Sequence, residues 1–463
     1  MDPLTKSIIE TTESDAERLQ RYQQAWRYYW ARAFFSVDEA EAKAIEDYLT
    51  KRGMFKEMRD VFSCIGRAVD TDARFVMKQK LTVEAEDRFA QAIEAMWERG
   101  NLQAEKYKLV RFGAALGDAY LYLLPSEVGP RLFVGNTEDW SPYYAPHDRT
   151  TMIAAKQSYV FIEAGKEHVW DRIFYPDRVE TYIDEKLQND QSFVHPFGEV
   201  PVIHCRNLDT GERFGASSWE VVHSRVDVLN EFASYMRRII FTYADPTLLA
   251  KNVEPPRDAS GKPVPLQRGV TPKGDNIMYI RGQDADMKPI EFQGNVLPQV
   301  LEFVKSIYDD IKEDLPELAL AKIRDQAGLS GYSVNLQLAD VIAKIGELRG
   351  NYGNGLEWAN QLALRAVFRS NAPLEEFQNR VVFEPVLPED RSTKLANWKE
   401  ERGLGITSRR EILREEGLTD DESAKLLQEI ADDEAGDVYG GRLRQEAMGG
   451  QTPVQPGQQG GGA

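Results

Sequence analysis

The amino-acid sequence predicts an α+β protein that is mostly helical, and three observations indicate this class. Long segments carry apolar residues at the alternating three-four spacing of amphipathic helices, above all between residues 219 and 369. Shorter segments between residues 118 and 206 alternate apolar and polar residues, as strands do. The 463 residues are 42% hydrophobic and 29% charged, which is typical of a soluble globular chain with about two to four domain-sized units.

Charge and cysteine content limit the function further. The formal net charge is −18, so the protein as a whole repels nucleic acid, and any DNA contact would have to be local or weak. Cys64 and Cys205 stand in different segments without the spacing of metal ligands, which favours a reduced, cytosolic protein. No apolar run has the length of a membrane span, and residues 1–13 show no signal-peptide pattern.

The first 124 residues predict five helices that lead into a sheet. Helices are expected over residues 15–35, 56–70, 83–99 and from Leu102 onward, the last running into an alternating segment at 120–123. Gly100 and Asn101 end the helix over 83–99, and Ser36 with Glu39 fits a capping box that opens a further one. The first helix is rich in aromatic residues. We expect these in the core, because aromatic side chains dominate buried area, with a partner-facing patch as the alternative.

A small β-rich layer is expected to follow on this helical base. Strands are predicted over residues 131–134, 151–162, 169–175, 179–183 and 200–206, separated by turn residues.

Two long amphipathic helices come next and organise the second half of the chain. Their apolar seams are formed by Trp219, Val222, Val226, Leu229, Ala233, Met236, Ile240 and Tyr243, and by Leu297, Leu301, Val304, Tyr308, Ile311 and Leu315. Their opposite faces are charged, with Arg225, Asp227, Glu231, Arg237 and Arg238 on the first and Glu302, Lys305, Asp309, Lys312 and Glu313 on the second. From periodicity alone, two ordinary helices of a helical domain are the simpler interpretation.

The segment between these helices is rich in Pro and Gly but carries strand-length apolar runs. Strands are predicted there over residues 247–251, 277–280 and 287–292, so we expect a compact α/β or β subdomain. Pro316 is expected to end or bend the second helix, and a short polar loop over 321–331 follows it.

A further long helix is expected from Ser333 to Phe368. Gly346, Gly350, Gly353 and Gly355 interrupt its pattern and predict a kink or a close helix contact. After it, a strand is predicted over 381–385. Capping boxes at Ser408/Glu411 and Thr419/Glu422 predict two short helices, and the Gly/Gln/Pro-rich composition beyond residue 436 predicts disorder.

No pattern of catalytic residues is found. Ser260-Gly261-Lys262 lacks the upstream glycine, strand and helix of a phosphate-binding loop, and the serines lack a nucleophile-elbow context. The dispersed histidines, interpreted as structural or surface residues, are His147, His168, His195, His204 and His223. Acidic pairs are expected by chance among 75 acidic residues. The sequence therefore predicts no enzyme, no cofactor and no metal site.

The order of these parts resembles the portal (head-to-tail connector) proteins of tailed double-stranded DNA bacteriophages, of the long-tailed type. The similar segments are Gly117-Asp118-Ala119-Tyr120-Leu121 with Pro142-Tyr143-Tyr144-Ala145-Pro146-His147-Asp148 and Ile173-Phe174-Tyr175; Val200-Pro201-Val202-Ile203 with Phe214-Gly215-Ala216-Ser217-Ser218-Trp219-Glu220-Val221; and Asp314-Leu315-Pro316-Glu317-Leu318 with Gly328-Leu329-Ser330-Gly331. The resemblance covers residues 102–431 and rests on the order of the parts, since no single motif is specific.

The resemblance implies a subunit with named parts. These are a wing over residues 1–217, a first stem helix over 218–243, a small α/β clip over 244–294, a second stem helix over 295–320, a tunnel loop over 321–331, a tunnel helix over 332–370, a C-terminal wing and helical crown over 371–435, and a disordered tail over 436–463. The glycines at 350–355 depart from the pattern of a plain tunnel helix.

It also implies a function. Portal proteins form a ring, typically of twelve subunits, at one capsid vertex of the virion after assembly in the host cytoplasm, and no membrane is involved. The implied partners are double-stranded DNA, bound without sequence preference and free to slide, the terminase large subunit, head-completion proteins, and the major capsid and scaffolding proteins. The implied roles are genome packaging, head-to-tail joining and DNA ejection.

In the tunnel loop, Lys322, Arg324, Gln326 and Ser330 would contact the DNA backbone weakly. An ordinary solvated connection between helices is the alternative for this loop. Two alternative functions remain open from the sequence: a structural or scaffolding virion protein without a channel, and a hydrolase with an unrecognised acidic pair.

Overall fold

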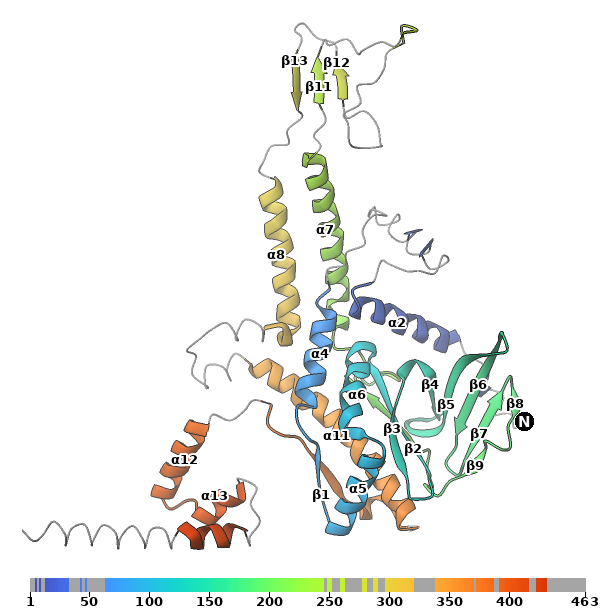
Figure 1. The fold of residues 1–463 in the computed structure, drawn as a ribbon, viewed down its shortest axis with the longest axis vertical. Helices are drawn as coiled ribbons and strands as arrows, with labels where there is room; N and C mark the ends of the chain where they lie inside the picture. Colours follow the sequence, from blue (N-terminus) through green and yellow to red (C-terminus); the bar gives the residue numbers. More distant parts are fainter. Residues whose placement is uncertain are drawn as a thin grey trace, which may run out of the picture. The chain divides into compact units, whose positions relative to one another are not determined.

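The computed structural model describes residues 5, 8–9, 13–32, 42–43, 46–47, 63–244, 248–251, 259–262, 277–280, 286–289, 296–319, 338–369, 372–386, 391–415 and 422–430. The chain divides into two units, Met1–Val386 and Leu387–Ala463. About half of the described residues are helical and the rest include fourteen strands, which confirms the α+β class (Figure 1).

Four helices form the N-terminal part of the larger unit: α2 (Glu13–Tyr29), α4 (Ile65–Val76), α5 (Asp87–Arg99) and α6 (Leu102–Leu116). The end of α5 at Gly100 is confirmed. The helix expected from residue 83 was wrong at its start, because Thr82–Ala85 forms strand β1, which pairs antiparallel with β14 (Asn379–Val382). That partner lies almost 300 residues away, so the local pattern could not reveal the pairing. The capping box at Ser36 and Glu39 lies outside the described residues.

Two sheets follow and make the β part larger than the small layer that was expected. A three-stranded sheet has the order β10-β2-β3 and is formed by Val202–Arg206, Asp118–Leu124 and Arg131–Gly135. A six-stranded sheet contains β4 (Trp140–Ala145), β5 (Asp148–Glu163), β6 (Lys166–Phe174), β7 (Arg178–Ile183) and β8 (Lys186–Leu187), with β9 (Phe193–Val194) pairing to β7. Strand β4 was missed because it contains Pro142 and shows irregular pairing with β5 at Tyr143 and Tyr144.

An aromatic core joins the two sheets. Tyr120 of β2, Trp140 of β4 and Phe174 of β6 are fully buried in one hydrophobic cluster, and the rings of Trp140 and Phe174 lie 5.4 Å apart. Full burial of side chains of this size stabilises the fold by about 1.5–3 kcal/mol each. The alternating Tyr120-to-Leu123 segment thus builds a strand of the core.

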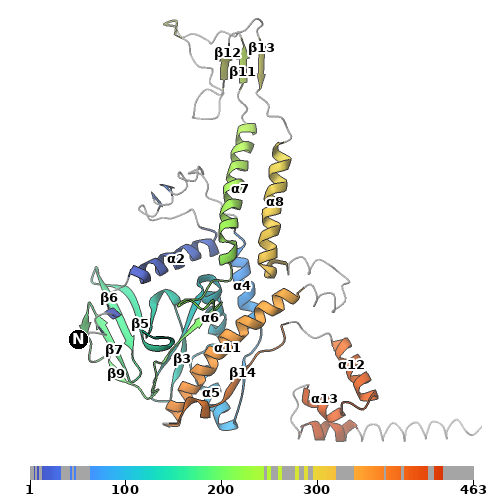
Figure 2. The same ribbon diagram turned by 180° about the vertical axis from the view of Figure 1, so that it is seen from behind.

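The first long helix is α7 (His223–Ala244), preceded by the short helix η2 (Glu220–Val222), and the second is α8 (Val296–Asp314), followed by η3 (Pro316–Ala319). They lie side by side in both views (Figures 1 and 2). Pro316 begins η3 and ends α8, as expected. Between them, β11 (Leu248–Lys251), β12 (Ile277–Ile280) and β13 (Asp286–Pro289) form a three-stranded sheet with the order β12-β11-β13, which confirms the three strands of the insert.

The third long helix, α11 (Ala339–Val367), runs without interruption through all four glycines, so the expected interruption was wrong. Gly346 and Gly350 face open space, whereas Gly353 and Gly355 are buried. The close contact predicted for this region exists, but its partners are a strand and Phe383 rather than another helix. Glycine at positions 353 and 355 allows α11 to pack close to Phe383 and to β10, because a Cβ at either position would crowd these neighbours.

The C-terminal unit contains α12 (Arg391–Gly403), α13 (Arg409–Glu415) and a helical segment over 422–430. Ser408 Oγ accepts a hydrogen bond from the Glu411 amide at 3.1 Å, which confirms Ser408 as the N-cap of α13. Helix α12 was missed, and Thr419 and the tail beyond residue 436 lie outside the described residues. Within the part of the chain that the structure describes, no helix is long and apolar enough to cross a membrane.

Candidate functional site

The candidate functional site is the antiparallel hairpin of α7 and α8 with its attachment to the rest of the larger unit. Arg225 near the start of α7 forms an ion pair with Asp314 at the end of α8, and the rings of Phe232 and Phe303 lie 4.8 Å apart in an edge-to-face contact. Both contacts connect residues about 70 or more positions apart, so the hairpin is held together by tertiary contacts as well as by its helical periodicity.

Burial along the two predicted seams is uneven. At the attached end Val226, Leu229, Ile311 and Leu315 are at most 2% exposed. Further along α8, Leu301 is 50% exposed and its neighbour Phe303 is 47% exposed. The seams therefore fill the core at one end and leave apolar surface uncovered along α8.

The start of the hairpin is fixed to the end of α6 by backbone and indole hydrogen bonds. The Ser218 amide donates to Ala114 O and the Trp219 indole donates to Ala115 O, each at 3.0 Å. Asp227, expected on the charged outer face of α7, is instead buried and accepts a hydrogen bond from the Tyr28 hydroxyl of α2. Periodicity placed Asp227 on the right helix but could not show that α2 covers that position.

A buried amide network links the start of the hairpin to α11. Asn207, which is fully buried, donates through Nδ2 to Ser218 Oγ at 3.1 Å and accepts at Oδ1 from the Tyr352 hydroxyl at 2.8 Å. Asn351 donates to Asn207 O at 2.9 Å. Because buried polar groups are costly when unpaired, this network fixes one arrangement of the three segments.

The end of the hairpin is attached through charged side chains. Lys344 of α11 lies 2.9 Å from Glu317 of η3 and 3.2 Å from Asp72 of α4, measured between Nζ and the carboxylate oxygens. Both carboxylates are 1% exposed. These three residues, here called the η3 cluster, join the elements on both sides of the segment 320–337.

A second buried centre lies where α2 meets the three-stranded sheet. Asp118 accepts hydrogen bonds from Tyr22 Oη at 2.5 Å, His204 Nε2 at 2.7 Å and the Gly215 amide at 2.8 Å. Burial alone would raise the pKa of Asp118, but the bonds from His204 and Tyr22 outweigh burial and lower it. His204 is therefore a structural residue, as the sequence indicated.

The four residues predicted to contact DNA, Lys322, Arg324, Gln326 and Ser330, lie outside the described residues, and their roles stay predictions. The residues that position the hairpin were missed as site residues, because none of them belongs to a short motif. The signal that was available is the run Ser217-Ser218-Trp219 at the start of a long amphipathic pattern.

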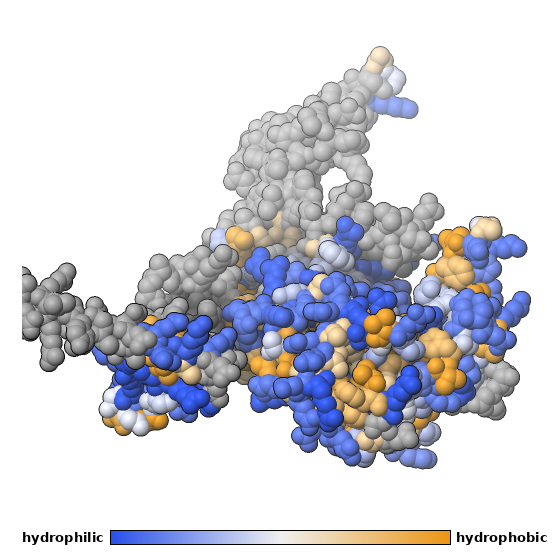
Figure 3. Space-filling view, turned by 60° about the horizontal axis from the view of Figure 1, so that its bottom comes forward, coloured by the Kyte–Doolittle hydropathy of each residue, from blue (hydrophilic) through white to orange (hydrophobic). Residues whose placement is uncertain are grey.

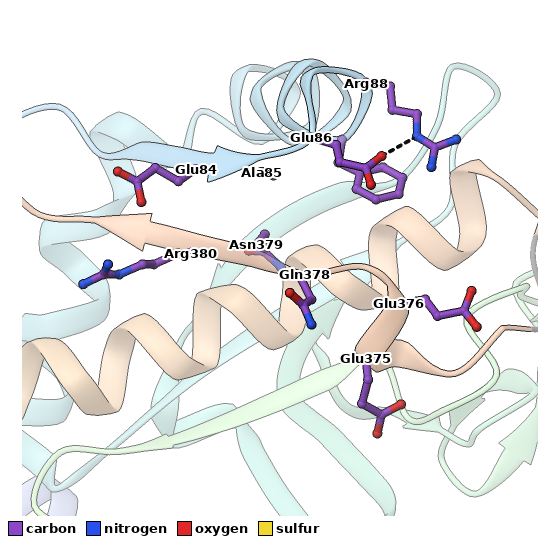
Figure 4. Close-up of a pocket in the computed structure, with 10 residues that line it drawn as sticks. Glu84, Ala85, Glu86, Arg88, Glu375, Glu376, Gln378, Asn379 and Arg380 are labelled. Carbon is purple, nitrogen blue, oxygen red and sulfur yellow. Dashed lines mark hydrogen bonds and ion pairs between the residues drawn. The ribbon is translucent and has the colours of Figure 1, made fainter. Parts of the chain in front are cut away.

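An open groove of about 810 Å³ lies beside β1 and β14 (Figure 4). Glu84, Glu86, Glu375 and Glu376 line it, and Arg88 forms an exposed ion pair with Glu86 at 3.0 Å. The described residues contain no group of three or more His, Cys, Asp or Glu side chains that could hold a metal ion. The four glutamates that line the groove are all exposed.

The face shown in Figure 3 is mostly hydrophilic, with hydrophobic residues gathered in separate patches. Several exposed apolar side chains belong to the hairpin of β5 and β6, where Val160 is 61% and Ile162 is 72% exposed.

Comparison with known proteins gives a family match over most of the chain. The family described as "Phage portal protein, SPP1 Gp6-like" matches residues 10–437. No curated protein matches the chain.

Similar solved structures come from gene transfer agent (GTA) particles. A chain of the virion of the native GTA particle is 16% identical, with 77% of this chain and 90% of that chain covered and a TM-score of 0.45. A chain of the neck of the empty GTA particle, computed with C6 symmetry, is 16% identical, with 80% and 93% covered and a TM-score of 0.46. A chain of the neck of the native GTA particle, computed with C12 symmetry, is 14% identical, with 82% and 92% covered and a TM-score of 0.42.

The family match spans far more than half of the chain and includes the hairpin, its attachments and α11. The chain belongs to the SPP1 Gp6-like family of phage portal proteins.

Proposed function

We propose that twelve copies of this portal protein form a ring around a DNA channel at one capsid vertex, with the α7–α8 hairpin as the stem. Membership of the family makes the chain a structural, non-enzymatic protein of the head-to-tail connector in the virion neck. The hydrolase alternative therefore has no support. The finer parts of the proposal are the subunit number, the channel and the assignment of the segments.

The observation that carries the proposal is the hairpin, buried at its attached end and apolar along α8. Leu301 and Phe303 leave about half of their surface uncovered, 50% and 47% respectively. Isolated exposed apolar residues are common, but two of them within one turn of a long hairpin helix favour a neighbouring subunit as cover for that part of α8. A head-to-tail contact that closes on itself produces a ring.

The acidic net charge of −18 supports a channel through which DNA slides. Attractive contacts to many phosphates would hold the polymer, whereas an acidic surface with a few local cations does not. We assign residues 321–331 to the tunnel loop, with Lys322 and Arg324 as its cations, and α11 to the tunnel helix.

The remaining assignments follow the same order. Residues 1–217 are the wing, 244–294 the clip that meets the terminase large subunit and later the head-completion proteins, 371–435 the C-terminal wing and crown, and 436–463 a tail. The clip assignment is supported by the three-stranded sheet of β11, β12 and β13, inserted between α7 and α8. Loops inserted between rigid elements commonly carry binding functions.

The experiment is native mass spectrometry of the purified full-length chain, with negative-stain microscopy, at several salt concentrations. We expect closed rings with a central opening. A strictly monomeric species at micromolar concentration overturns the ring. Closed particles without an opening would favour a non-channel structural role.

The clip is tested separately. Replacing residues 244–294 by a short Gly/Ser linker is expected to leave rings intact and to abolish DNA packaging. Normal packaging by that variant would show that the clip assignment is wrong.

A further inference from the structure

The η3 cluster has an unbalanced charge. With Asp72, Glu317 and Lys344 all ionised, two carboxylates share one ammonium, which leaves a net negative charge in a site where both acids are 1% exposed. Among the described residues, Glu317 Oε2 and both carboxylate oxygens of Asp72 have no hydrogen-bond partner. A buried, uncompensated charge is strongly unfavourable, so one of the two acids is expected to hold a proton.

The protonation preferences of the three groups agree with this geometry. Burial, and then the charge of Asp72, raise the pKa of Glu317 to about 7. Burial also raises the pKa of Asp72, although Lys344 and Ser218 oppose the rise. For Lys344, the charges of Asp72 and Glu317 outweigh burial and raise its pKa, so the ammonium persists.

Other groups that face the cluster do not titrate in this range. The Cys64 thiol faces Glu317, and burial raises its pKa. The charge of Asp72 also acts on the Tyr352 hydroxyl, and burial raises the pKa of this hydroxyl well above the usual value. Ser218 is not ionisable. Asp72 and Glu317 therefore share the one proton of the cluster, and Glu317 is the member that lies in η3 at the end of α8.

The η3 cluster connects three separate elements of the fold. Glu317 lies in η3 directly after α8, Lys344 lies in the second turn of α11, and Asp72 lies on α4. The three side chains are thus the charged connection that holds the end of α8 against two other helices. Removing one proton from this site adds a buried, uncompensated negative charge. The free-energy cost of that charge falls when the carboxylate becomes exposed to water.

We propose that the η3 cluster is a proton-dependent clamp: a proton on Glu317 keeps η3 docked on α4 and α11, and its loss loosens the attachment of α8. The sign follows from linkage, since the docked state raises the carboxyl pKa from 4.5 to about 7. The stabilisation is fully present below pH 4.5 and is lost as pH rises through about 7.

The experiment is hydrogen exchange measured by mass spectrometry on the full-length protein, from pH 5.5 to pH 8, with rates corrected for the intrinsic pH dependence of exchange. We expect the opening of peptides that cover η3 to increase by about 25-fold over this range, as for one proton bound at pKa values near 7 when docked and near 4.5 when open. A flat corrected profile overturns the proposal.

Three variants identify the group. Glu317→Gln keeps the shape without the titration, and should keep η3 protected and make its exchange independent of pH. An unchanged pH profile in that variant overturns the assignment to Glu317. Asp72→Asn removes the repelling charge, so the midpoint should move to lower pH; an unmoved midpoint contradicts the shared site.

Lys344→Met keeps the aliphatic stem and should open η3 at every pH, and unchanged protection would also refute the clamp. The matched control is Glu313→Gln, an exposed glutamate on α8, whose profile should follow that of the wild type.

Discussion

Gly355 of α11 lies against Cys205 of β10, so that a Cβ at position 355 would stand 2.5 Å from the Cys205 sulfur. This contact sets the distance between the third long helix and the three-stranded sheet. It also explains why glycine occurs in the middle of a continuous helix, where it costs about 1 kcal/mol relative to alanine.

The first prediction is that Gly355→Ala destabilises the protein by about 1–3 kcal/mol, the usual cost of overpacking a core. The measurement is the free energy of unfolding from urea titration. Gly350→Ala is the matched control on the same helix, because a Cβ there meets nothing within 4 Å. It should stabilise the protein by about 0.5–1 kcal/mol.

A double variant tests the cause of this effect. Cys205→Ala removes the sulfur that the new methyl group meets, so Gly355→Ala should cost less in that background than in the wild type. Equal costs in both backgrounds would show that the sulfur is not the obstacle.

The second prediction concerns Asp118, whose pKa is lowered in the folded protein from its usual 3.8. A lowered carboxyl pKa contributes stability above the unfolded value, and that contribution is lost as pH falls below about 4. Tyr22→Phe removes one of the hydrogen bonds that hold this pKa low. We expect it to cost about 1–3 kcal/mol at pH 7, because a buried acceptor loses its donor, and less at pH 3.

The measurement is the urea midpoint at both pH values. Tyr107→Phe serves as the control, since its hydroxyl makes only a 3.4 Å bond to Lys78 O. If Tyr22→Phe lowers stability equally at both pH values, the Tyr22 hydrogen bond does not contribute to the lowered pKa of Asp118.

The third prediction tests the pairing of the hairpin through Arg225 and Asp314, whose side chains are 44% and 36% exposed. Each charge reversal, Arg225→Asp or Asp314→Arg, should lower stability by about 0.5–1 kcal/mol, as for an exposed ion pair replaced by like charges. The double swap should recover most of that loss. If the two single effects simply add, the two side chains do not interact in solution.

Much of this fold is predictable from local sequence patterns, whereas strands β1 and β4 were not predicted. The seams of α7 and α8 and the alternating segments of β2, β5 and β7 follow from helical and strand periodicity. Strand β1 was read as helix because its partner β14 is remote in sequence, and β4 was missed because Pro142 breaks its pattern. Pairing between distant segments has no local signal.

The candidate site was less predictable than the fold. Lys344 and Glu317 look like surface charges in the sequence, and only tertiary packing makes them a buried cluster with Asp72. Asp227 shows the same effect, since a residue on the charged side of α7 is buried by Tyr28. The family resemblance supplied the function because it rests on the order of segments, which periodicity does reveal.

The last prediction concerns Lys322 and Arg324, the two cations of the segment 321–331. If this segment lines the channel, ring symmetry repeats both charges around the DNA, where each contacts the phosphate backbone without reading bases. Lys322→Ala with Arg324→Ala should leave ring formation unchanged, because neither residue belongs to the hairpin or to its described attachments. The yield of filled heads should fall several-fold, and the deficit should grow at lower salt, where phosphate contacts are strongest.

The matched control is Lys166→Ala with Lys186→Ala, which removes the same charge from exposed positions of the six-stranded sheet. The control should package normally, because its positions lie on the six-stranded sheet, outside the segment assigned to the channel. Filled heads of normal number and normal DNA length in the Lys322/Arg324 variant would remove these cations from the mechanism. A loss of packaging in both variants would instead make net charge, rather than the position of the two cations, the cause.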